Sequence, residues 1–329
     1  MRKKSTPPDL PLRAGIRPNS VFLPPLTDAE SCPRVLDFLI ARFPAIPADE
    51  WLRRMEQGDV LDSQGISVPV DAPYRPATRL YYYREQAAEI IVPFQEIILF
   101  EDENLLVVDK PHFLPTQPSG AYVQETLISR LRHKQGSGAL EALHRLDRDT
   151  AGLVMIARNA RARDAYHALF RQQQITKTYL AVASLNGALS FPLTRSSRIG
   201  PAAVFYRRQE VPGAVNAITR IELVARQDSL GLYRLFPLTG KTHQLRIHMA
   251  ALGIPILNDP YYPLEKRPLE KGQLEKKPLE KESAEIPPVR PPDDFAHPLQ
   301  LLAQELAFID PISGEPRHFV SARTLTLTT

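Results

Sequence analysis

One short stretch of the chain places a carboxylate between two arginines, directly before an apolar segment. Residues 145–148 read Arg-Leu-Asp-Arg, and an apolar run follows over 152–157. Nearby positive charge favours the ionised form of a carboxylic acid, so we expect Asp147 to be ionised between Arg145 and Arg148. An ionised aspartate on a loop that enters a buried strand can act as a nucleophile, a base or a ligand. The alternative is a polar turn without chemistry.

Two later motifs supply further groups that could work with this carboxylate. Residues 177–180 read Lys-Thr-Tyr-Leu, and residues 239–248 read Thr-Gly-Lys-Thr-His-Gln-Leu-Arg-Ile-His. In this order and at this spacing, the three motifs resemble the RluA-type pseudouridine synthases, which isomerise uridine to pseudouridine in RNA. The resemblance covers roughly residues 97–320.

The resemblance implies a role for each matching residue. Asp147 would be the catalytic carboxylate, and Arg246 would hold it in an ion pair. Tyr179 would stack on the uracil and is a candidate for removing the proton from its C5, while Arg145 would fill the place of the flipped base. Whether Asp147 attacks the sugar or assists elimination to a glycal stays open. Further candidates for binding the substrate or RNA are His144, Arg148, Lys177, Lys241 and His243.

The chemistry that this resemblance implies needs no cofactor and no metal. Pseudouridine formation breaks a glycosidic N–C bond, turns the uracil and makes a C–C bond to the same sugar, so it is redox-neutral and involves no hydrolysis. It requires one ionised carboxylate, a dry pocket and a way to take the uridine out of its stack. We therefore expect RNA, either ribosomal or transfer RNA, to be the partner.

Two other sites suggest themselves in the third motif, and the spacing argues against both. The run 240–242 reads Gly-Lys-Thr as in a phosphate-binding loop, but that motif needs a glycine five residues earlier, where Leu235 stands. His243 and His248 suggest a metal, but residues five apart lie about 140° apart around a helix.

Two further alternatives concern Asp147 itself. Asp147 and Asp149 could form a glycosidase pair, but neighbours two apart on one loop rarely straddle a sugar. The chain could also be an RNA-binding or ribosome-assembly protein that has lost activity on the same fold. The presence of Asp147, Tyr179 and Arg246 argues against this alternative, because a pure binding protein does not need the carboxylate.

Composition is that of a soluble globular protein. Of 329 residues, 43% are hydrophobic and 24% are charged, and the single cysteine, Cys32, excludes an internal disulfide and is typical of a reducing cytosol. The chain has no run of about eighteen apolar residues that could span a membrane, and its N-terminus lacks the apolar part of a signal peptide. We expect a cytoplasmic monomer. A net charge of +4 permits binding to nucleic acid, and basic residues cluster over 145–177 and 195–208.

We predict an α+β fold, in which a catalytic domain of the pseudouridine synthase type follows a small α+β module. The catalytic domain, residues 89–329, should contain a mixed, largely antiparallel sheet with flanking helices. Residues 1–30 should be an extended or disordered arm. Residues 31–88 resemble an αL RNA-binding module, and a generic α+β module is the alternative. A Pro-Leu-Glu-Lys repeat within 263–292 predicts a solvated insertion, with a binding role as the alternative.

Apolar periodicity and cap residues predict the individual elements. Asn159 should cap one helix at its start, and Gly253 should end another. Helices are expected over 34–43, from 47 to a stop at Gly58, and over 122–134, 160–173 and 242–252. Strands are expected at 60–61, 66–70, 80–83, 97–100, 105–108, 152–157, 176–184, 203–206, 217–224, 232–238 and 298–309.

Overall fold

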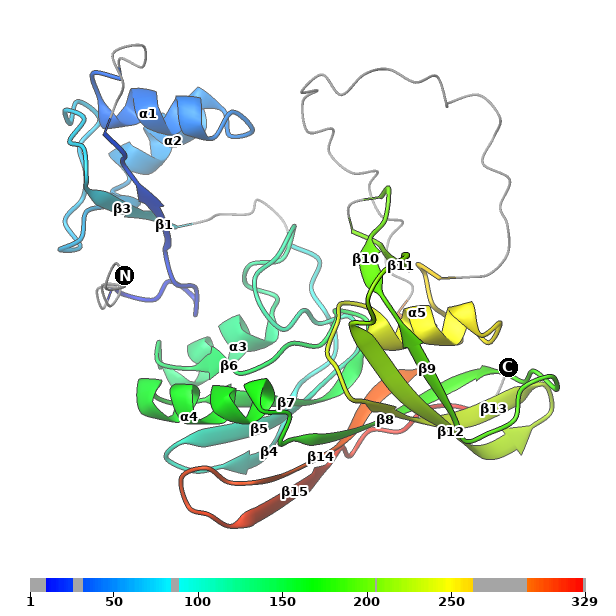
Figure 1. Cartoon of the computed structure of the whole chain (residues 1–329). Coiled ribbons are helices and arrows are strands. Elements are labelled where there is room, and N and C mark those ends of the chain that lie inside the picture. The colour runs from blue at the N-terminus through cyan, green and yellow to red at the C-terminus, as the bar shows by residue number, and fades with distance from the viewer. Residues whose placement is uncertain (1–9, 26–31, 84–88, 205, 263–294, 328–329) are drawn as a thin grey trace, which may run out of the picture.

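The structure is a computed structural model of the chain, shown in Figure 1, and it describes residues 10–25, 32–83, 89–204, 206–262 and 295–327. The insertion predicted at 263–292 lies outside the described residues, and so do residues 1–9 and 26–30 of the predicted arm.

A small unit near the N-terminus consists of two helices packed on a three-stranded antiparallel sheet (Figure 1). Its elements are β1 (Asn19–Phe22), α1 (Val35–Arg42), α2 (Ala48–Glu56), β2 (Val60–Leu61) and β3 (Arg79–Tyr82), and the strand order is β1-β3-β2. Trp51 is fully buried at its centre, and its ring meets the edge of Tyr82 at a centroid distance of 5.2 Å. Large aromatic rings supply most of the apolar area that such a small core can bury.

Two segments of this unit differ from the prediction. Asn19–Phe22, which fall in the predicted arm, form β1, because Val21 pairs with Leu80 and its side chain enters the core. The segment 66–70, predicted as a strand, forms only an isolated bridge between Ser67 and Leu61. The small unit therefore begins before residue 31.

One mixed sheet of ten strands is the scaffold of the rest of the chain (Figure 1). Its main path runs β4-β5-β7-β14-β8-β13-β12-β9, with β15 paired to β14 and β6 paired to β7. Within it, β7 and β14 pair in parallel and the other pairings are antiparallel. The strands are β4 (Ile97–Glu101), β5 (Leu105–Lys110), β6 (Glu141–Ala142), β7 (Ala151–Ala157), β8 (Thr176–Ser184), β9 (Leu193–Ser197), β12 (Ala217–Gln227), β13 (Leu230–Pro237), β14 (Leu301–Ile309) and β15 (Pro316–Val320). This confirms the predicted fold class.

Helices cover both faces of the sheet where β5 and β7 lie. Helix α3 (Leu127–Gln135) packs on the face that carries Leu106 and Val154, and α4 (Ala160–Arg171) packs on the face that carries Leu105 and Leu153. Every residue of β5 and β7 is consequently buried. Covering on both faces explains why these strands read as continuous apolar runs rather than as an alternating pattern.

The helix boundaries follow local capping. Asn159 accepts a hydrogen bond from the Ala162 N–H at 2.8 Å and begins α4, as predicted. The helix predicted from residue 122 instead begins at Leu127, because Thr126 caps it through the Ser129 N–H. Helix α5 (Gln244–Ala251) lies over β8 and β13, and Gly253 follows it in the left-handed region.

A short two-stranded ribbon projects from the sheet beside α5 (Figure 1). It consists of β10 (Ile199–Pro201) and β11 (Arg208–Glu210), which pair antiparallel. The strand predicted at 203–206 was wrong, since Ala203, Val204 and Tyr206 lie in the bend and turn that join β10 to β11. Apolar residues in a turn mimicked the composition of a strand.

Strands β8 and β13 separate at one end, and this separation shapes the site. Their pairing ends at Tyr179 and Leu235. Beyond this pair β8 continues back to Thr176 against β14, while β13 continues to Pro237 against β12. The sheet is therefore open between these two strand ends.

Candidate active site

Asp147 lies on the loop that joins β6 to β7, and buried polar groups fix the backbone of this loop. Thr116 accepts a hydrogen bond from the Leu146 N–H at 3.1 Å, and its hydroxyl donates to the Leu146 carbonyl at 2.9 Å. The Thr150 N–H donates to the Asp147 carbonyl at 3.1 Å. These bonds orient the loop without using the carboxylate of Asp147.

A buried lysine also fixes this loop, through hydrogen bonds to backbone carbonyls. The Lys110 ammonium donates to the carbonyls of Pro111, Leu114 and Arg148 at 2.9, 2.7 and 3.2 Å. Burial lowers the pKa of Lys110 to about 7, and the charges of Asp147 and Asp149 oppose that shift. Three carbonyl acceptors match the three N–H groups of an ammonium, so the geometry favours the charged form.

A pocket of about 200 Å³ opens in front of Asp147. The side chain of Asp147 is 23% exposed, so it can meet a ligand. The pocket brings together most of the residues that the sequence predicted for the site. Its lining includes Arg145, Asp147, Lys177, Tyr179, Lys241, His243 and Arg246.

Arg246 is buried on α5, and its closest partner is not the predicted one. Its Nε and Nη2 donate to the two carboxylate oxygens of Asp259 at 2.8 and 2.6 Å. Its Nη1 lies 3.8 Å from Asp147 Oδ2 and has no hydrogen-bond partner among the described residues. The pKa of Arg246 is raised, because the hydrogen bonds and charge of Asp259 outweigh burial, which on its own would lower it. The guanidinium thus stays charged and points its free edge at Asp147.

Asp259 is a site residue that the sequence analysis missed. Its Oδ1 also accepts hydrogen bonds from the N–H groups of Tyr261 and Tyr262 at 2.8 and 3.1 Å. The Arg246 guanidinium lies 4.7 and 5.4 Å from the centroids of these two rings. The only signal in the sequence was an aspartate before Pro-Tyr-Tyr at residues 260–262, which reads as a turn.

His243 is the second side chain that faces Asp147, after Arg246. Its Nε2 lies 3.7 Å from Asp147 Oδ2, and its Nδ1 lies 2.7 Å from the hydroxyl of Tyr262. The backbone at His243 has φ +58°, a left-handed turn that begins α5. Burial lowers the pKa of His243, although Asp147 opposes the shift. A neutral imidazole therefore sits beside the carboxylate near neutral pH.

Tyr179 lies on β8 at the position where this strand leaves β13. The ring packs partly against the two apolar clusters on either side and lines the pocket. Burial raises the pKa of the Tyr179 hydroxyl, and the charge of Asp147 raises it further. The phenol is consequently protonated, with its ring available to a flat ligand.

The remaining predicted residues divide between the pocket and its surroundings. Arg145 is exposed at the rim, and Arg148 forms an ion pair with Asp149 at 3.3 Å. His144 does not line the pocket, since its Nε2 accepts the Met155 N–H at 3.0 Å. Burial lowers the pKa of His144 to about 3, which keeps that nitrogen an acceptor.

No other kind of centre was found in the described residues. Within the ranges that the structure covers, no group of three or more His, Cys, Asp or Glu side chains is placed to hold a metal ion. None of the helices in these ranges has both the length and the apolar character needed to cross a bilayer.

Comparison with known proteins gives a consistent match. The family model described as RNA pseudouridylate synthase matches residues 104–251. An uncharacterised RNA pseudouridine synthase of Synechocystis is 29% identical over 69% of this chain and 79% of its own length. The ribosomal large subunit pseudouridine synthase C of Rickettsia bellii is 29% identical over 67% and 72%. The mitochondrial tRNA pseudouridine(32) synthase of Saccharomyces cerevisiae is 27% identical over 70% and 50%.

The fold matches as well. The solved structure of human RNA pseudouridylate synthase domain containing 1 aligns over 72% of this chain and 86% of its own, with a TM-score of 0.52 and 22% identity. Among the curated relatives, coverage ranges widely, and the chain spans about half the length of several of them, for example 55% of one Mycoplasma pneumoniae relative.

Proposed function

Since the chain belongs to the RNA pseudouridylate synthase family, we propose that it isomerises uridine to pseudouridine in RNA with Asp147 as the nucleophile. This family is the one that the three sequence motifs predicted. The observation that carries the proposal is the pairing of Asp147 with Arg246 in a pocket that also contains Tyr179. It is the arrangement that a carboxylate acting on a flipped nucleoside requires.

Each side chain has a distinct task in this proposal. The uracil of the flipped uridine lies against the ring of Tyr179, because an aromatic face binds any pyrimidine. Asp147 acts at the sugar, either by attack on its carbon or by assisting elimination to a glycal. Arg246 orients the carboxylate by charge attraction, since its Nη1 lies 3.8 Å from Asp147 Oδ2. Arg145, at the rim, fills the place that the flipped base leaves.

The reaction balances without an added reactant. The bond from N1 of the uracil to the sugar breaks, the uracil turns, and a bond from C5 to the same carbon forms. The proton on C5 is lost to solvent and N1 gains one, so the product is an isomer. The chain's own residues need only supply charge, orientation and exclusion of water.

The proposed substrate is structured ribosomal or transfer RNA. Relatives named for the large ribosomal subunit and for a tRNA position support this class. We also propose that the protein acts in the cytoplasm, which its single cysteine supports. A monomeric state stays a prediction.

Tritium release from RNA labelled at C5 of uridine tests the assignment directly. Asp147→Asn removes one charge from a loop whose backbone is fixed by Thr116 and Lys110, so the variant should fold normally and lose turnover by more than about a hundredfold. The matched control is Asp228→Asn, on an exposed turn between β12 and β13. Turnover by Asp147→Asn within about tenfold of wild type would reject the nucleophile.

A further inference from the structure

A groove of about 540 Å³ lies next to the pocket at Asp147 and continues from it. It occupies the gap where β8 and β13 separate beyond Tyr179 and Leu235. Its volume is more than twice the 200 Å³ of the pocket at Asp147, and both share Lys177, Thr239 and Lys241 in their lining. A strand of RNA whose uridine enters the pocket would therefore meet this groove next.

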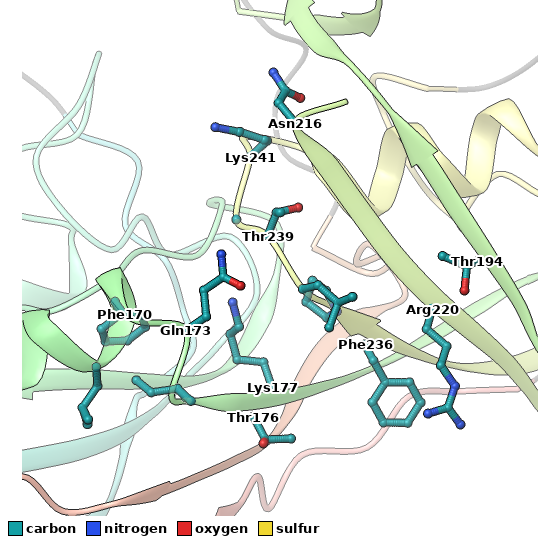
Figure 2. Close-up of a pocket in the computed structure, with 15 residues that line it drawn as sticks. Phe170, Gln173, Thr176, Lys177, Thr194, Asn216, Arg220, Phe236, Thr239 and Lys241 are labelled. Carbon is teal, nitrogen blue, oxygen red and sulfur yellow. The ribbon is translucent and has the colours of Figure 1, made fainter. Parts of the chain in front are cut away.

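The walls of the groove carry aromatic rings on opposite sides. Phe170, at the end of α4, lies on one side, and Phe236, on β13, lies on the other, as Figure 2 shows. Arg220 of β12 places its guanidinium 5.0 Å from the centroid of the Phe236 ring. Rings and stacked guanidinium groups bind the flat face of any nucleobase without selecting its sequence.

The groove is positively charged. Among the residues that the structure describes, its charged lining residues are Lys177, Lys241 and Arg220, and none of the lining residues is a carboxylate. Figure 2 shows Lys177 between the two aromatic walls and Lys241 farther along the groove, near Asn216 and Thr239. Neither ammonium has an ion-pair partner in the part of the chain that the structure describes, and Arg220 pairs with Glu222 outside the groove. Unpaired cations that line a cavity favour a phosphate as the ligand.

The ring of His144 packs against Phe170. The ring of His144 lies 5.0 Å from the ring of Phe170, with 37° between their planes. His144 is itself fixed by the Met155 N–H, which donates to its Nε2. The histidine that the motif predicted as an RNA contact therefore supports a wall of the groove rather than facing the pocket.

We propose that this groove binds the nucleotide next to the target uridine on the RNA strand, with its base against Phe170 and Phe236 and its phosphate near Lys177 and Lys241. The inference rests on the proposed function of the neighbouring pocket. It assigns the contact to single-stranded RNA, because a paired base could not reach the rings.

Binding of single-stranded RNA tests the groove separately from catalysis. The probe is a fluorescein-labelled oligouridylate of roughly ten nucleotides, long enough to cover pocket and groove, titrated into the full chain and followed by anisotropy. Phe236→Leu and Arg220→Gln should each weaken binding about fivefold, as expected for the loss of one stacking contact. Two controls lie elsewhere on the same sheet: Phe100→Leu, a half-buried ring on β4, and Arg226→Gln, an exposed arginine further along β12. Both should bind like wild type.

A second measurement protects against a folding defect in Phe236→Leu. The same oligonucleotide with one 5-iodouridine is irradiated with wild-type protein, and the linked peptides are identified by mass spectrometry. Cross-links to Phe170 or Phe236 support the groove. Cross-links found only outside the groove, or groove variants that bind as tightly as the two controls, overturn it.

The two proposals fail in different ways. If wild type releases no tritium from any uridine-labelled RNA, the proposed isomerisation falls while the binding and cross-linking results still decide the groove. If wild type is active, Arg220→Gln should raise KM with kcat unchanged, because the contact forms before the reaction and persists through it. An unchanged KM with unchanged oligonucleotide affinity would reject the groove alone.

Discussion

Arg246 makes its two close hydrogen bonds to Asp259, at 2.8 and 2.6 Å, and reaches Asp147 only at 3.8 Å. The guanidinium is therefore fixed by one carboxylate and presents its remaining edge to another. Because Asp147 contributes no short hydrogen bond to this arginine, its oxygens stay available to a substrate. One guanidinium thus faces two carboxylates, closely at Asp259 and more distantly at Asp147.

The first prediction concerns the free energy of this pairing. Arg246→Ala should destabilise the fold by roughly 3–5 kcal/mol, because it leaves Asp259 as a buried carboxylate without its partner. Adding Asp259→Asn should recover part of that loss, so the double mutant should be more stable than Arg246→Ala alone. Urea unfolding of the two single variants and the double variant gives the coupling free energy, which should exceed about 1 kcal/mol.

A second double-mutant cycle, which combines Arg246→Ala with Asp147→Asn, serves as the control. Asp147 is partly exposed and lies farther from the guanidinium, so its coupling to Arg246 in stability should be below about 1 kcal/mol. If the losses of unfolding free energy in Arg246→Ala and Asp259→Asn are strictly additive, the two side chains are not partners.

The sequence predicts the candidate residues that line the pocket at Asp147 but not Asp259, which holds the Arg246 guanidinium. Asp147, Tyr179 and Arg246 stand in recognisable motifs, and the fold brings all three to one pocket. Asp259 stands in a turn thirteen residues after Arg246, and nothing in its neighbours distinguishes it from an ordinary turn aspartate. Only the path of the chain after α5 shows that the turn returns to the guanidinium.

The fold was predictable where local signals and burial agree. Strand β8 has the predicted bounds Thr176–Ser184, and Asn159 begins α4 as its capping chemistry requires. The separation of β8 from β13 could not be predicted, because strand partners and their register depend on contacts distant in sequence. That separation creates the groove beside the pocket.

The second prediction separates two tasks of Tyr179. Burial raises the pKa of its hydroxyl, so a phenolate base is costly and the ring face is the more available function. Tyr179→Phe should therefore retain turnover within about tenfold, whereas Tyr179→Ala should lose more than about a hundredfold through lost stacking. Tritium release and RNA affinity are measured for both variants. A deep loss of turnover in Tyr179→Phe with affinity unchanged would assign the C5 proton to the hydroxyl.

The third prediction is a loss of stability on acidification. Burial lowers the pKa of His112 and His248 to about 4 and that of His144 to about 3, from 6.5 in an exposed side chain. Because the pKa of each histidine is lower in the folded state, the unfolded chain binds more protons than the folded protein between these two pKa values. The stabilisation is therefore complete above pH 6.5 and is lost as the pH falls from there towards 4.

His248→Gln isolates one of these contributions. His248 is fully buried between Ser197 and Thr219, which lie 3.0 and 2.9 Å from its two ring nitrogens, and Glu210 and Arg195 are the charges that act on it. At low pH, the lowered pKa of His248 should reduce the free energy of unfolding by roughly 3 kcal/mol. Urea unfolding at pH 7.0, 5.5 and 4.5 should show a shallower pH dependence for the variant. An equal slope in both proteins would mean that His248 is protonated in the fold.

The fourth prediction concerns the segment before β1, which joins the small unit to the catalytic domain. Tyr83 donates to the Pro11 carbonyl at 2.6 Å, while Gly15 packs against α3 with φ +76°. A Cβ at Gly15 would lie 2.1 Å from the Ser129 carbonyl oxygen. Gly15→Ala should therefore detach this segment and speed its cleavage by protease, with the melting of the catalytic domain little changed. Gly120→Ala is the control, since its Cβ would meet no atom within 4 Å.

The last prediction is that residues 1–88 can be removed without unfolding the catalytic domain. Among the described residues, three large apolar clusters of the sheet contain none before Val92, so the cut leaves these clusters complete. The cut must keep Glu89, whose carboxylate accepts the N–H groups of Val123, Gln124 and Glu125 before α3. The remaining domain should still release tritium. If residues 31–88 bind RNA, as their predicted αL character implies, its log–log dependence of affinity on salt should flatten by about one for each lost phosphate contact. An unchanged slope would show that these residues do not touch RNA, and an insoluble truncation would show that the small unit and the catalytic domain fold as one.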